Sequence, residues 1–173
     1  VSRPLRAYAL AEIGIGVFAL VFPLATRAVQ AVFWELHADG TAGLALRAAL
    51  SFALLLFPTA LMGATLPFLT EYFRRNPRSG RTWRVGLLYA ANTLGAAIGI
   101  VVTSLVLIEL IGISATTTLA ALSNFAIAAV AWRVSDERAA AAPAAPAAKA
   151  LPAPMRREAR VVILLLFASG ALA

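Results

Sequence analysis

Residues 48–70 read AALSFALLLFPTALMGATLPFLT, an apolar run without a charged side chain. As an α-helix this run would be roughly 35 Å long, which exceeds the hydrocarbon core of a bilayer at about 30 Å. Inside lipid, each backbone N–H and C=O needs a partner within its own segment, so a run of this kind forms a helix. A membrane barrel would require short segments of alternating polarity instead. The run therefore predicts a transmembrane helix.

Three other apolar runs are long enough to cross a bilayer, at residues 7–26, 85–108 and 110–132, and the first of them carries one acid, Glu12. A shorter apolar run at 159–173 indicates the start of a further membrane helix, which we expect to be truncated because the chain is a fragment of a longer polypeptide. The predicted fold class is all-α: a polytopic transmembrane helical bundle in residues 1–134, with four complete spans, followed by the truncated fifth.

The composition excludes several other classes of protein. Of the 173 residues, 61% are apolar and 13% are charged, whereas soluble domains have about 45–50% and about 25%. The absence of cysteine excludes disulfides, thiolate metal sites and thiol nucleophiles. The net charge of +7 comes from basic residues placed between the apolar runs. This placement indicates membrane topology, so we expect a lipid bilayer and no nucleic acid as partner.

The basic residues predict the orientation of the chain. Thirteen of the fifteen Lys and Arg residues precede the first run, lie in loop 74–84, or follow the fourth run. Only Arg27 and Arg47 are on the other side, in an outer loop. By the positive-inside rule, loop 74–84 and segment 135–158 are cytoplasmic. The latter is rich in Ala and Pro, which predicts a semi-extended linker between two membrane units.

Three polar residues near or within the spans are candidates for contacting a solute: Glu12, Asn92 and Glu109. A charged carboxylate inside a membrane helix costs about 2.5–3.5 kcal/mol, so Glu12 requires compensation. Either Glu12 has a function, or it pairs with Arg6 or with a helix outside this chain. Asn92 either crosslinks helices or contacts a ligand. Glu109, at the outer end of its run, is expected to be an interfacial carboxylate.

Small residues in the third run indicate close helix packing. Gly95 and Gly99 form a GxxxG pattern, which allows two helix backbones to approach. We interpret this pattern as packing against a neighbour in the same bundle, and we assign Gly63 in the second run the same role.

Two prolines in the second run, Pro58 and Pro67, are predicted kink sites. Thr59 directly follows Pro58, and Thr65 lies shortly before Pro67. We expect the two threonine hydroxyls to bond the backbone carbonyls that the prolines leave without a donor.

The sequence contains no pattern for covalent chemistry. It has no glycine-rich phosphate loop, no Ser/His/Asp set and no cluster of metal ligands. His37, between Glu35 and Asp39, is interpreted as part of a solvated outer loop. We therefore predict no catalytic residue, no metal and no cofactor in this chain.

Stretches 3–16, 58–67 and 86–99 resemble the membrane region of the bacterial membrane-fused spermidine synthase-like proteins. Stretch 164–171 resembles the opening helix of that family's second helical repeat. These proteins join a helical region similar to the major facilitator superfamily to a cytoplasmic, Rossmann-type aminopropyltransferase-like domain. The resemblance implies an inner-membrane, multi-pass anchor for a catalytic domain of the same polypeptide, with a polyamine or other small cation as partner.

The resemblance has departures. Thr103-Ser104 stands where the family often has a Gly-Phe pair, and the surroundings of His37 match nothing in the family. A Rossmann glycine motif is absent, so aminopropyl transfer is assigned to no residue here. Two alternatives stay open: a secondary transporter of the major facilitator type without an enzymatic domain, and a purely structural membrane anchor.

Overall fold

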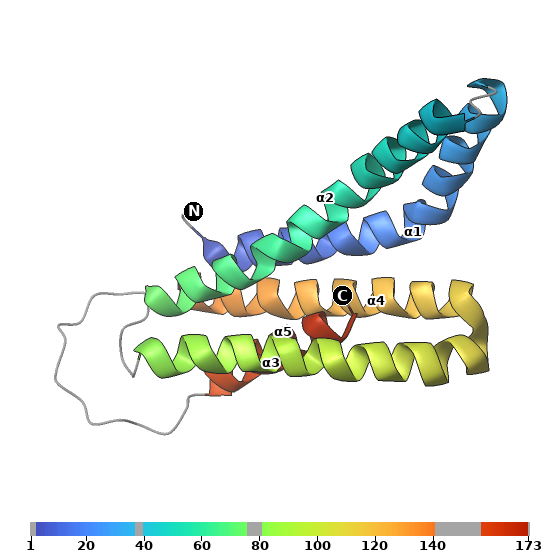
Figure 1. Cartoon of the computed structure of the whole chain (residues 1–173). Coiled ribbons are helices and arrows are strands. Elements are labelled where there is room, and N and C mark those ends of the chain that lie inside the picture. Colours follow the sequence, from blue (N-terminus) through green and yellow to red (C-terminus); the bar gives the residue numbers. More distant parts are fainter. Residues whose placement is uncertain (1–2, 37–39, 76–80, 141–156, 173) are drawn as a thin grey trace, which may run out of the picture.

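The computed structural model describes residues 3–36, 40–75, 81–140 and 157–172, and almost all of them are helical (Figure 1). No strand occurs among these residues, so the predicted all-α class is confirmed. The elements are α1 (Pro4–Leu36), α2 (Gly40–Arg74), α3 (Arg81–Val102), the π-helix η1 (Thr103–Leu107), α4 (Ile108–Ala140) and α5 (Arg157–Leu172).

Three helical stretches in the described residues are long and apolar enough to cross a membrane: Pro4–Glu35, Gly40–Arg74 and Val85–Asp136. The last of these is not straight. Gly112 has φ 77° and ψ 168°, which is not helical, and the chain reverses direction there (Figure 1). A positive φ is accessible to glycine because it lacks a Cβ. Since Gly112 follows Glu109, the reversal comes a few residues later than the predicted boundary between the third and fourth runs.

The helices extend well beyond the predicted spans. The outer loop expected at 27–47 is mostly helical, because α1 continues to Leu36 and α2 begins at Gly40. Arg27 and Arg47 are therefore helix residues, while His37 and Asp39 lie outside the described residues. The chain from 27 to 36 has no Gly or Pro to stop α1.

The predicted linker at 135–158 is partly helical as well. α4 runs to Ala140 and α5 begins at Arg157, so helix occupies both ends of that segment. The rest of this prediction falls on residues 141–156, which lie outside the described residues.

The prolines lie inside uninterrupted helices. α2 continues through Pro58 and Pro67, whereas α1, which contains Pro23, changes direction in its second half (Figure 1). The expectation for the threonines was wrong in detail. Thr59 donates to the Leu55 carbonyl and Thr65 to the Met62 carbonyl, both at 2.7 Å. The carbonyls that the two prolines leave without a donor belong to residues 54 and 63. Each threonine therefore bonds the carbonyl next to the free one in the sequence.

The helices pack in two main pairs, α1 with α4 and α3 with α5, and α2 packs on α1. The second half of α1 and the first half of α2 run together away from α3 and α4 (Figure 1). Many apolar side chains stay exposed, for example Trp34 at 81% and Leu110 at 76%. Such a surface is unfavourable in water and suits lipid tails.

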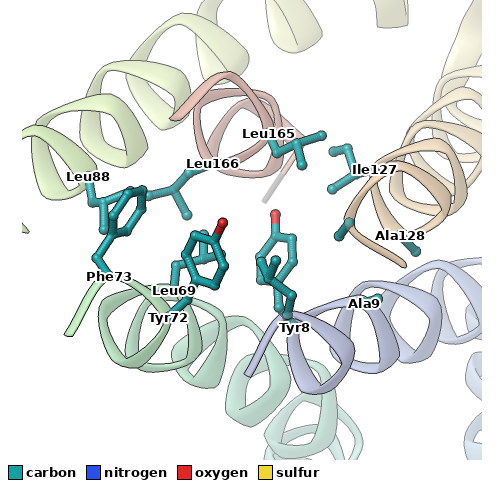
Figure 2. Close-up of a cluster of buried hydrophobic side chains, with 12 residues drawn as sticks. Tyr8, Ala9, Leu69, Tyr72, Phe73, Leu88, Ile127, Ala128, Leu165 and Leu166 are labelled. Atoms are coloured by element: carbon teal, nitrogen blue, oxygen red, sulfur yellow. The ribbon is translucent and has the colours of Figure 1, made fainter. Parts of the chain in front are cut away.

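One end of the bundle gathers the basic termini of the helices. The start of α1, α3 and α5 and the finish of α2 and α4 lie at this end (Figure 1). There the Arg6 guanidinium donates to Asp136 at 2.7 Å and stacks 5.3 Å from the Trp132 ring, which ties α1 to α4. Close by, a buried cluster is formed by side chains from all five α-helices, among them Tyr8, Leu69, Leu88, Ile127 and Leu166 (Figure 2).

Candidate functional site

Glu12 is fully buried on α1, with 0% of its surface exposed. The Ser169 hydroxyl of α5 donates a hydrogen bond to Glu12 Oε1 at 2.7 Å. The second carboxyl oxygen, Oε2, is buried and has no hydrogen-bond partner in the described structure. Pairing with Arg6, one of the alternatives considered for Glu12, does not occur, because Arg6 bonds Asp136 at the end of the bundle.

Tyr8 extends this polar site along α1. It precedes Glu12 by one helical turn, so both side chains are on the same face of the helix. Its hydroxyl is buried and lies near the Glu12 carboxyl, but it does not meet the geometry of a formed hydrogen bond to a described residue. Figure 2 shows the hydroxyl groups of Tyr8 and Tyr72 directed toward α5. Two neighbouring buried oxygens, Tyr8 Oη and Glu12 Oε2, are thus unsatisfied.

Small residues on α3 and α5 bring Ser169 to this position. A Cβ added at Gly95 would collide with the Phe167 carbonyl, and one added at Gly99 with the Ala171 carbonyl. The GxxxG pattern therefore packs against α5, in the same bundle, with the two backbones in direct contact. Gly63 has open space around it within the described residues, because that face of α2 meets no other helix there.

Asn92 and Glu12 approach the same part of α5. The Asn92 side-chain oxygen is 3.1 Å from the position that a Cβ would take on Gly170, next to Ser169. Asn92 is half-buried, while Glu109 is exposed and precedes the reversal at Gly112. The structure therefore places two of the three candidate residues beside one segment of α5 and leaves Glu109 outside the site.

Several buried polar residues were not among the predicted site residues, among them Tyr8, Ser169 and Asn124. Ser169 is the one side chain with a polar group in residues 161–173, and Tyr8 has the i, i+4 spacing to Glu12. The sequence could therefore have indicated both residues as partners of a buried Glu12. Asn124 is 3% exposed and lies on α4, which packs against α1 through Gly16.

The site combines a carboxyl group with hydroxyl groups and lacks a charged partner among the described side chains. A buried acid in this condition is stabilised by binding a cation or a proton. Within the described residues no group of three or more His, Cys, Asp or Glu side chains could hold a metal. The arrangement is therefore suited to binding a small positive species.

Comparisons of this chain with protein-family models, with curated proteins and with solved structures found no match. Its function is consequently inferred from the site and from the resemblance of the sequence.

Proposed function

We propose that this chain is the membrane-embedded part of a spermidine synthase-like protein, which anchors an aminopropyltransferase-like domain and receives a polyamine or other small cation at Glu12. The resemblance of stretches 3–16, 58–67 and 86–99 supports the family. The observation that carries the cation site is the buried Glu12 carboxyl, whose Oε2 atom has no partner in the described structure.

An organic ammonium group fits the chemistry of these side chains. A primary ammonium carries three N–H donors and a positive charge. Glu12 Oε2 and Tyr8 Oη are buried acceptors without a hydrogen bond, and the Asn92 side-chain oxygen lies nearby beside α5. A charge-assisted hydrogen bond to Oε2 would remove the cost of leaving that oxygen unpaired.

The proposed membrane arrangement is major facilitator-like, with four complete spans and α5 as the beginning of the next. The reversal at Gly112 supports this count, because it divides the stretch Val85–Asp136 into two antiparallel passes. We place the protein in the inner membrane, with the arginine-rich end of the bundle facing the cytoplasm.

Cysteine labelling tests this orientation. The chain has no cysteine, so a single introduced one reports its own position. We expect a membrane-impermeant maleimide to label Trp34→Cys on intact cells and to label Arg133→Cys only after the membrane is permeabilised. Both residues are exposed and lie toward opposite ends of the bundle. The reverse pattern would show that the topology is inverted.

Replacing the carboxyl of Glu12 tests the cation site. Glu12→Gln keeps an acceptor for Ser169 and removes the negative charge, so we expect spermidine to bind at least about tenfold more weakly, equivalent to about 1.4 kcal/mol. Calorimetric titration of spermidine into the protein in lipid nanodiscs measures this change. Glu109→Gln is the matched control, because that carboxyl is exposed, and it should bind spermidine as the unaltered protein does. Equal affinities in all three proteins would refute the site.

A second candidate function, a structural clamp, is favoured by the 2.7 Å hydrogen bond that joins α1 to α5. In this case Glu12 and Ser169 hold the first helix against the helix that follows segment 135–158. Ser169→Ala would then lower the free energy of unfolding by about 1–3 kcal/mol, because it leaves both carboxyl oxygens of Glu12 unpaired. Ser123→Ala, which loses only a bond within α4, is its control. The clamp is the better explanation if stability falls and no spermidine binds to the unaltered protein.

A further inference from the structure

The Glu12 site is sealed from its surroundings. Glu12 and Tyr8 are 0% exposed, and Ser169 of α5 is 8% exposed. Gly95 and Gly99 hold α5 over the site through backbone contact with Phe167 and Ala171. In this arrangement a ligand larger than a proton reaches Oε2 only if α5 moves.

The groups around the carboxyl are polar and uncharged. They are Tyr8 on α1, one helical turn before Glu12, and Ser169 on α5, which donates to Oε1. No ion pair to Glu12 occurs among the described side chains: Arg6 bonds Asp136, and Arg74 and Arg75 bond Glu71. A carboxylate at Glu12 would therefore be a buried charge without a counter-ion among the described residues.

We propose that Glu12 holds a proton on Oε2 while α5 covers the site, and that a cationic amine takes the site by displacing this proton. Oε1 is then the carbonyl oxygen, which accepts from Ser169. Oε2 is the hydroxyl oxygen, and a small rotation directs its hydrogen to Tyr8 Oη. One proton in this way gives a hydrogen bond to Glu12 Oε2 and to Tyr8 Oη together.

The exchange balances in atoms and charge. The neutral acid and an alkylammonium ion give a carboxylate–ammonium pair and release one proton to solvent. The presence of a proton on Glu12 does not depend on the proposed function. The displacement of this proton by an amine rests on the proposed function. α5 regulates the site in this scheme, because its displacement from α3 exposes Glu12 to the incoming amine.

Infrared spectroscopy of the whole chain, reconstituted in vesicles of phosphatidylethanolamine and phosphatidylglycerol, tests the proposal. At neutral pH we expect the C=O band of a protonated carboxylic acid, which is lost in Glu12→Gln and retained in Glu109→Gln. Ser169→Ala removes the hydrogen bond to the carbonyl oxygen, so the band should move to higher frequency, whereas Ser123→Ala should leave it in place. The frequency shift in Ser169→Ala identifies the band as that of Glu12 even if the Glu12→Gln variant does not fold.

Spermidine is the probe for the exchange. We expect its addition to remove the band and to release about one proton per bound molecule, measured with an indicator dye in weak buffer. Absence of a band that depends on Glu12 overturns the proposal, and so does spermidine binding without proton release. A Glu12 band that persists because spermidine does not bind supports the proton assignment and refutes the proposed function, so the two failures are distinguishable.

Discussion

Replacing Gly95 by leucine is expected to separate α5 from α3. A Cβ at this position would collide with the Phe167 carbonyl and lie 3.1 Å from the Ala171 amide nitrogen. Both are backbone atoms of a helix, so they cannot rotate away as the end of a side chain would. Overpacking a tight contact costs about 1–3 kcal/mol. Because the contact here is to backbone, we expect a loss at the upper end of that range, about 3 kcal/mol, in the stability of the bundle.

Spin labels at Val85→Cys and Arg160→Cys measure this separation. Both residues are exposed, and they lie near the beginning of α3 and of α5. We expect a longer and broader distance distribution in Gly95→Leu. Gly63→Leu provides the control, since nothing lies within 4 Å of a Cβ there among the described residues. Identical distributions in the two variants would mean that α3 does not hold α5.

The second large effect is expected for Glu12→Lys. The new ammonium would face Ser169 in a buried site that offers no described acid as a partner. An uncompensated buried charge costs about 3–5 kcal/mol. We expect most of the folded protein to be lost, measured as resistance to protease after extraction from the membrane.

Ser169→Asp in the same chain should recover much of that loss, because it places a carboxylate on α5 opposite the ammonium group introduced on α1. Glu109→Lys tests whether any added lysine has the same effect, and at this exposed position we expect a change within about 0.5 kcal/mol. A double variant that is no more stable than Glu12→Lys alone would show that positions 12 and 169 do not face each other.

Local rules predicted much of this protein. Long apolar runs indicated the helices, and Glu12 stood out as the one acid well inside such a run. The same rules underestimated the helices at 27–36 and 135–140, because charged residues there suggested loops. They treated Gly63 like Gly95, although only Gly95 meets a second backbone. A glycine in an apolar helix permits close approach, but it does not show which side another helix occupies.

The amino-acid sequence alone determined the all-helical class and the grouping of arginines between the apolar runs. Both follow from hydropathy and from backbone hydrogen bonding, which act within a single segment. The partner of Glu12 is 157 positions away. That contact depends on how closely α5 can approach α3 and α1, and this is decided by packing between helices that are distant in the chain.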